Sequence, residues 1–364
     1  MNESAGYPAN GRTIVASHDI SFPRADEINP SLTPAEIVLM RQAARECVAC
    51  DLINDAEGFI TAAQQNTAAL PERLVGRLRA FRRYSSPNGG MLIRGLPVFE
   101  VPPTPQDPNL AVGTRLTAAG VLAMIAVVIG DQYGFKPELN GQIIQDIVAV
   151  RGFENTQQSI SSETELYTHI ELAFTEYRPD YLALFCLRGD HEKVAGTMLS
   201  AIDAILPMLS ADSVGILRQP RFKTTVDESF LRGMGRGEPI YVNPIRVFTG
   251  SVSRPRVRAD FAETTGIDRA AQAALDELRR AADKVAVTAY LEPGDLLLID
   301  NNHAFHGRMP FRARWDGEDR WLLRTSITRD LSRSAAHRPG DGRIVDVDYC
   351  GEAEVITQQG EIRK

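Results

Sequence analysis

A histidine and a glutamate lie one residue apart in "YTHIELAF", residues 167 to 174, among mostly apolar and aromatic neighbours. We expect residues 166 to 174 to be extended, so that His169 and Glu171 project from the same side, because side chains alternate across a strand. Two ligands on one face can take neighbouring positions around a metal ion. The pair alone also fits a partly buried salt bridge at a strand end.

A third ligand is available much further along, in "LEPGDLLLIDNNHAFHG", where His306 follows a buried strand. Two histidines and one carboxylate on one face of an ion leave the other face open, as in the facial triad of non-haem Fe(II) oxygenases. The same three residues with a bound water also fit a zinc hydrolase.

Two arginines lie four residues apart in "GEDRWLLRTSIT", which reads as a strand. Arg320 and Arg324 therefore point to the same side. Buried guanidinium groups need anionic partners, and arginine can hold a carboxylate through two hydrogen bonds. Two such arginines near an iron ion would hold two different carboxylates. The alternative is surface salt bridging with the acidic loop 316–319.

The elements that position these residues divide the chain into three parts. Residues 1–30 are polar and turn-rich, which predicts an extended arm. Residues 31–135 predict a mostly helical flank, whose first helix begins with a Thr33–Glu36 capping box. Its last helix, near residues 115–130, is apolar on every face and is expected in the core.

Short strand-like runs separated by turns fill residues 141–333, with helices expected near 192–206, 210–218 and 268–282. Many short strands favour a sandwich or a barrel, against one face of which the early helices would pack. We see no internal repeat, so residues 1–364 are expected to form a single domain.

Composition narrows the partners. The 364 residues are 43% hydrophobic and 24% charged, and the formal net charge of −7 argues against nucleic-acid binding. No membrane partner is expected, because the longest apolar run is too short for a span. The N-terminus lacks signal-peptide character, so we expect a cytoplasmic protein. Four cysteines, including the Cys47–Cys50 pair, are interpreted as structural. Oligomeric state is not indicated.

The motifs "THIELAF", "RPDYLALFCLRGD", "GDLLLIDNNHAFHGRMPF" and "DRWLLRTSIT" occur in this order between Gly141 and Arg333. Together they resemble the clavaminate synthase-like group of Fe(II)/2-oxoglutarate oxygenases, whose members hydroxylate free arginine, asparagine or lysine. The resemblance implies an α+β fold with a mainly β core, a double-stranded β-helix (jelly roll) flanked by N-terminal and inserted helices. It also implies Fe(II), 2-oxoglutarate as co-substrate and O₂.

The resemblance assigns the catalytic iron ligands to His169, Glu171 and His306, and makes His303 a neighbour. It places Arg320 on the far carboxylate of 2-oxoglutarate, with help from one threonine. That threonine matches Thr197.

For the substrate, the resemblance places Arg324 on the α-carboxylate and Gln145 on the amino-acid head, and also assigns Glu171 and Asp260 to this molecule. Asp260 falls where relatives carry acidic groups for a cationic side chain. Arginine-specific relatives have an Asp-x-Asp arrangement, but here Asp260 is followed by Phe and Ala, which weakens the case for arginine. The alternative for Asp260 is a solvated turn residue.

The implied reaction is hydroxylation of an unactivated C–H bond, at C3 or C4, of a free polar or basic L-amino acid in specialised metabolism. Lysine, arginine and citrulline are examples of such a substrate. Glu171 favours hydroxylation, because related halogenases leave the carboxylate position vacant for chloride. Desaturation or ring closure within the family stays open, and so does a non-catalytic metal-binding jelly-roll protein.

Overall fold

The structure, a computed structural model, describes residues 21–349. Most of the predicted N-terminal arm, residues 1–20, lies outside this range. The next residues do not extend freely: a 3-10 turn at Arg24–Asp26 leads into strand β1 (Glu27–Ile28), which pairs in parallel with β2 (Gly90–Ile93). This end of the chain is therefore attached to a sheet.

The predicted helical flank is present as four helices, α1 (Pro34–Ala49), α2 (Ala56–Gln65), α3 (Glu72–Tyr84) and α4 (Thr117–Ile129). The predicted capping box starts α1: the Glu36 backbone N–H donates to the Thr33 hydroxyl at 3.2 Å, and the Thr33 N–H donates to the Glu36 carboxylate at 2.8 Å. Within residues 21–349, no single helix is long and apolar enough to cross a membrane. Only the segment 108–129 reaches that composition, as a pair of helical pieces bent by 83°.

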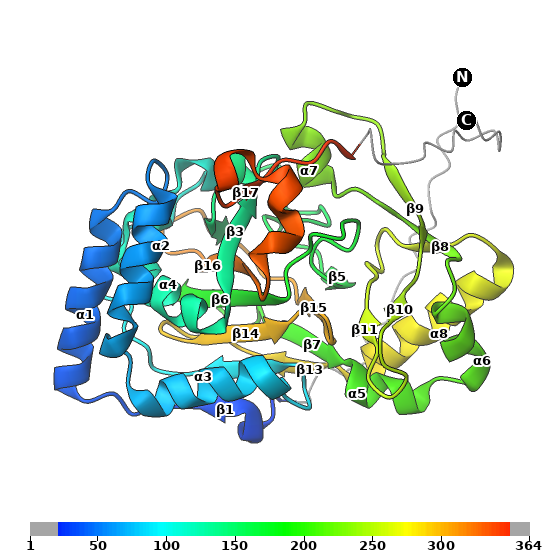
Figure 1. Cartoon of the computed structure of the whole chain (residues 1–364), viewed down its shortest axis with the longest axis horizontal. Helices are drawn as coiled ribbons and strands as arrows, with labels where there is room; N and C mark the ends of the chain where they lie inside the picture. Colours follow the sequence, from blue (N-terminus) through cyan, green and yellow to red (C-terminus); the bar gives the residue numbers. More distant parts are fainter. Residues whose placement is uncertain (1–20, 350–364) are drawn as a thin grey trace.

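A large mixed sheet supports these helices. Its strands run in the order β1-β2-β14-β6-β16-β3-β17, and β4 also pairs with β16. The remaining bounds are β3 Asp131–Phe135, β4 Ile144–Val148, β6 Tyr181–Arg188, β14 Leu296–Asp300, β16 Trp321–Thr328 and β17 Ile344–Val345. The helices lie on one side of this sheet (Figure 1). Trp321, Leu323 and Ile327 alternate along β16 and pack into the same apolar cluster as the helices.

A smaller antiparallel sheet has the order β13-β7-β15-β5, with bounds Val287–Ala289, Thr197–Ala201, Ala304–Arg308 and Leu166–His169. A separate apolar cluster joins the two sheets: Leu184, Leu297 and Leu322 come from the large one, and Leu199 and Ala304 from the small one. The large sheet therefore has a helix-covered face and a face directed toward the small sheet.

The remaining strands and α-helices lie beside the small sheet, except α7, which lies near β17 (Figure 1). They are β8 Phe222–Thr225, β9 Tyr241–Ile245, β10 Phe248–Thr249, β11 Arg256–Val257, β12 Thr265–Gly266, α5 Ile202–Ile205, α6 Ala211–Leu217, α7 Glu228–Gly233 and α8 Arg269–Val285. Helices α6 and α8 confirm the helices predicted near 210–218 and 268–282. The mixed helix-and-sheet class is confirmed as well.

Two local predictions were wrong. Residues 192–206 do not form one helix: Thr197–Ala201 is strand β7, paired with β13 on one side and β15 on the other, and only Ile202–Ile205 is helical, as α5. Cross-strand pairing here overrides local preference. Residues 166–174 are not one strand either: β5 ends at His169, and a turn follows in which Leu172 has a φ of 54°.

Candidate active site

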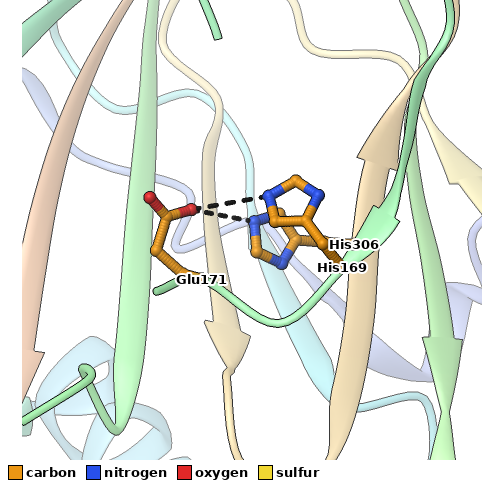
Figure 2. A group of neighbouring side chains, drawn as sticks. All are labelled: His169, Glu171 and His306. Carbon is orange, nitrogen blue, oxygen red and sulfur yellow. Dashed lines mark hydrogen bonds and ion pairs between the residues drawn. The ribbon is translucent and has the colours of Figure 1, made fainter. Parts of the chain in front are cut away.

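Three side chains from two distant parts of the chain meet beside the small sheet: His169 and Glu171 from one, and His306 from the other (Figure 2). His169 ends β5, and His306 lies directly opposite it in the antiparallel partner β15. The Glu171 carboxylate lies 3.3 Å from Nε2 of His306 and 3.7 Å from Nε2 of His169. One donor atom from each residue lies within 4.8 Å of the other two. His306 is thus on a strand of its own, whereas the sequence indicated only that it follows one.

Glu171 reaches this position from a turn and not from the predicted strand. The buried side chain of Asn301 holds the turn: its Oδ1 accepts the Glu171 backbone N–H at 2.8 Å, and its Nδ2 donates to the Glu171 carbonyl at 3.1 Å. The same amide donates to the Pro179 carbonyl at 2.9 Å. Sequence reasoning missed Asn301, although a polar residue directly after a buried strand was a signal.

The three ionisable groups shift one another's pKa values. Burial disfavours protonation of His169, but the carboxylates of Glu171 and Asp260 outweigh burial and raise its pKa to about 9. Burial and the charge of His169 lower the pKa of His306 to about 4. Burial alone would raise the pKa of Glu171, but Arg324 and the two histidines hold it well below 4.5. A carboxylate and two imidazoles that compete for protons can also bind a cation.

This donor set fits Fe(II). Two imidazole nitrogens and one carboxylate converging from one side are the ligands of the facial triad, which leaves the remaining positions for other molecules. The three side chains line a cavity of about 460 Å³, within the range of small-molecule sites. His303, the other histidine nearby, pairs instead with Asp300, their side chains 3.0 Å apart.

Arg320 lines the same cavity, and its guanidinium lies over the ring of Phe311 at 5.8 Å. It is 6% exposed, and no residue between 21 and 349 forms a hydrogen bond or ion pair with its guanidinium. The hydroxyl of buried Thr197, also on the cavity wall, likewise has no partner among those residues. A buried cation and a buried hydroxyl with nothing to bind indicate a site for an anion.

Arg308 also lines the cavity, beside Thr197, and was not predicted from the sequence. It pairs across strands with Thr197, and one of its nitrogens donates to the Ser161 hydroxyl at 2.9 Å. Its Nε and the other terminal nitrogen are buried without a partner in the described chain. Burial and the neighbouring charge of Arg320 lower the pKa of Arg308 to about 9. Its spacing two residues after His306 in a strand was the available signal.

Arg324 faces the cavity from β16, on the side opposite the helices. Its guanidinium donates to Glu171 at 2.8 Å and to Gln145 at 2.6 and 2.9 Å, and it also pairs with Glu138. The alternative that Arg320 and Arg324 pair with the loop 316–319 is wrong, since neither forms such a contact. Glu138 was not predicted.

Acidic side chains from two further segments also line the cavity. Asp260 lies beside His169, to which it forms an isolated antiparallel bridge, and faces the cavity. It is therefore a cavity residue and not a solvated turn residue. Asp227, which precedes α7, faces the same space and was not predicted. The cavity thus combines metal donors, arginines and carboxylates.

Comparisons with known proteins agree with this geometry. Residues 216–326 match the taurine catabolism dioxygenase TauD, TfdA family. The chain is 41% identical to the L-asparagine oxygenase of Streptomyces coelicolor, over 80% of this chain and 86% of that protein. It is 35% identical to the L-lysine 3-hydroxylase of Catenulispora acidiphila, over 95% and 97%. Identity to clavaminate synthase 2 of Streptomyces clavuligerus is 33%, over 79% and 89%.

Solved structures are similar along nearly the same length. Asparagine oxygenase in complex with Fe(II), 2S,3S-3-hydroxyasparagine and succinate superposes with a TM-score of 0.81 and 36% identity, over 89% of this chain and 100% of that one. The non-haem iron oxygenase OrfP with Fe and alpha-ketoglutaric acid gives a TM-score of 0.76 and 31% identity, over 88% and 99%.

The fold and the triad define a non-haem iron oxygenase of the TauD type. Within that class, the chain belongs to the clavaminate synthase-like Fe(II)/2-oxoglutarate-dependent oxygenases. Enzymes of this family use Fe(II), 2-oxoglutarate and O₂.

Proposed function

We propose that this enzyme hydroxylates C3 or C4 of a free L-amino acid with a polar or basic side chain. The observation that carries the proposal is a single cavity lined by the triad and by two buried arginines. Arg320 has no partner among residues 21–349, whereas Arg324 contacts one of the triad residues, Glu171. Each arginine would bind one carboxylate: one belongs to the co-substrate and the other to the substrate.

His169, Glu171 and His306 would hold the iron on one side. When bound, the iron with 2-oxoglutarate and O₂ supplies the oxidant that hydroxylates an unactivated C–H bond. Arg320 and Thr197 would bind the far carboxylate of 2-oxoglutarate, which supplies the anion that their unpaired groups lack. The apolar side chains around them exclude water, which strengthens these polar contacts.

Arg324 and Gln145 would bind the head of the substrate. The pairing of Arg324 with Glu138 indicates how: the substrate's α-carboxylate takes the place of Glu138, and Glu138 then receives the α-ammonium group. Because Arg324 also contacts Glu171, the substrate head is held next to a metal ligand. Clamping both charged groups of the head fixes which side-chain carbon faces the oxidant.

We also propose that the large and small sheets form the double-stranded β-helix of one oxygenase domain. The apolar cluster between them supports this, since it joins strands of both sheets directly behind the cavity. The filled carboxylate position at Glu171 supports hydroxylation as the outcome.

The test is turnover by the Fe(II)-loaded protein in air with 2-oxoglutarate and a panel of free L-amino acids, scoring succinate and hydroxylated product for each. We expect amino-acid-dependent succinate together with product. Arg324→Ala should raise the amino acid KM more than the 2-oxoglutarate KM. Absence of amino-acid-dependent succinate across a wide panel would refute the proposal.

A further inference from the structure

The cavity holds more negative charge than the iron site and the substrate head require. Asp227, Asp260 and Glu263 line it in addition to Glu138 and Glu171, which already contact Arg324. Asp227 lies between β8 and α7, whereas the other two follow β11, so distant segments place carboxylates on one wall.

Among these carboxylates, that of Asp227 has no partner within the described part of the chain. It occupies the N-cap position of α7, where an aspartate side chain ordinarily accepts a backbone N–H, but its side chain makes no capping bond. No hydrogen bond or ion pair to its carboxylate comes from residues 21–349. In contrast, Glu263 accepts a hydrogen bond from Thr225, and Asp260 accepts the Ala262 N–H at 2.7 Å. The side chain of Asp227 is therefore available to a ligand in the cavity.

The cations nearest this wall are committed to other groups: Arg324 pairs with Glu138 and Glu171, and His169 is one of the three metal donors. Arg232 also lines the cavity, but it donates to Gln158 at 2.9 Å and lies over the ring of Phe153 at 5.0 Å. Burial and the negative charges of Asp260 and Glu171 raise the pKa of Asp227 well above its ordinary 3.8. A positively charged ligand group would stabilise the ionised carboxylate of Asp227, whereas a neutral amide would not.

We infer that the side chain of the substrate ends in a cationic nitrogen, held by Asp227 together with Asp260, so that the substrate is a basic amino acid. The inference rests on the proposed function, because it assumes that a free amino acid occupies this cavity. Overall identity does not decide the question: one relative named above acts on asparagine, which is neutral, and another on lysine, which is cationic. The unpaired carboxylate favours the cationic class.

The first experiment compares matched substrates with the Fe(II)-loaded full-length protein. Lysine is paired with norleucine, arginine with citrulline, and ornithine with glutamine, and kcat/KM for hydroxylation is measured for each. We expect one cationic member to exceed its neutral partner by at least about tenfold. Equal or better turnover of the neutral partners, or of asparagine, overturns the inference and leaves the proposed function standing. If no amino acid is hydroxylated, the proposed function itself fails.

The second experiment tests the residue. Asp227→Asn should lower kcat/KM for the preferred cationic substrate by at least about tenfold and reduce its advantage over the neutral partner. The 2-oxoglutarate KM should not change. Calorimetric titration of the substrate into the metal- and 2-oxoglutarate-bound variant should show the same loss of affinity. Asp212→Asn is the matched control, because Asp212 is exposed on α6 and does not line the cavity. An unchanged cationic preference in Asp227→Asn would overturn the assignment.

Discussion

The two faces of strand β16 differ in character: one packs into the apolar core and the other carries charge into the cavity. Toward the helices it presents Trp321, Leu323 and Ile327, which are fully buried in an apolar cluster. Toward the small sheet it presents Arg324, and Arg320 lies one residue before the strand on the same side. The first face buries apolar surface and stabilises the fold. The second keeps buried charges next to a cavity, which costs stability unless a ligand binds.

The difference teaches that stability and function are divided between alternate residues of one strand. A substitution on the helix side should change the free energy of unfolding and leave the binding constants alone. A substitution on the cavity side should change the binding constants more than the free energy of unfolding. The expected outcomes below run from the largest effect to the smallest.

Removing a metal ligand is the most severe change on the cavity side. His306→Ala should reduce turnover to background and abolish stoichiometric Fe(II) binding, since the triad loses one of three donors. Circular dichroism and the melting temperature should stay near those of the wild type. His303→Ala is the control, because His303 pairs with Asp300 and should leave turnover intact. Normal metal binding by His306→Ala would contradict the assigned triad.

Arg320→Ala should raise the 2-oxoglutarate KM roughly 30-fold or more, equivalent to about 2 kcal/mol, because the far carboxylate loses a buried guanidinium partner. Steady-state kinetics at saturating amino acid would measure it, and the amino acid KM should change little. An unchanged 2-oxoglutarate KM would show that the two arginines are assigned wrongly.

Leu323→Ala tests the helix side. Leu323 is fully buried in the apolar cluster on the helix side of β16. Truncating its side chain should therefore cost about 2–5 kcal/mol in the free energy of unfolding. Urea denaturation followed by fluorescence would report the loss. Both KM values should be those of the wild type at a temperature where the variant is folded. A large change in KM without a loss of stability would erase the distinction between the faces.

Asn301→Ala should weaken metal binding by about 10- to 100-fold, because Asn301 fixes the backbone of the ligand Glu171 through two hydrogen bonds. Titration of the metal-free protein with Fe(II) under anaerobic conditions measures the affinity directly. Asn302→Ala is the matched control, since the neighbouring amide bonds to Asp180 instead. Equal affinities for the two variants would deny Asn301 a positioning role.

The smallest effect concerns an ion pair on the exposed end of α1. Hydrogen bonds from Arg73 and from the Thr33 backbone lower the pKa of Glu36 to about 2, below its ordinary 4.5. A lowered pKa adds stability above about pH 4.5, and this contribution is lost as the pH falls toward 2. The stability advantage over Glu36→Gln should therefore shrink over that interval in urea melts. A constant advantage would contradict the shifted pKa.

Much of this arrangement was predictable. The capping box at Thr33, the buried helix that became Thr117–Ile129 and the helix Arg269–Val285 all follow from local patterns. The shared side of Arg320 and Arg324 follows from alternation along a strand. Local periodicity sufficed in each case, because these features depend on residues only a few positions apart.

Other features depended on distant partners. Thr197–Ala201 looked helical and became a strand, because two other strands hydrogen-bond to it. Glu171 reaches the triad from a turn, and this turn is held by a hydrogen bond to the buried Asn301, a residue distant in the sequence. Asp227 gave no signal of its own, since an aspartate before a short helix ordinarily caps it.

By itself, the sequence determined which residue types were present and in what order: two histidines and a glutamate, then two arginines four apart. It also determined their family resemblance and the alternation that puts both arginines on one side. The tertiary structure alone decided which buried charges would find partners. Arg324 meets Glu171 and Glu138, whereas Arg320 and Asp227 face the cavity with no ion pair to any other residue between 21 and 349. The reason is physical: charge pairing depends on distances between segments far apart in the chain, and these exist only after the sheets have assembled.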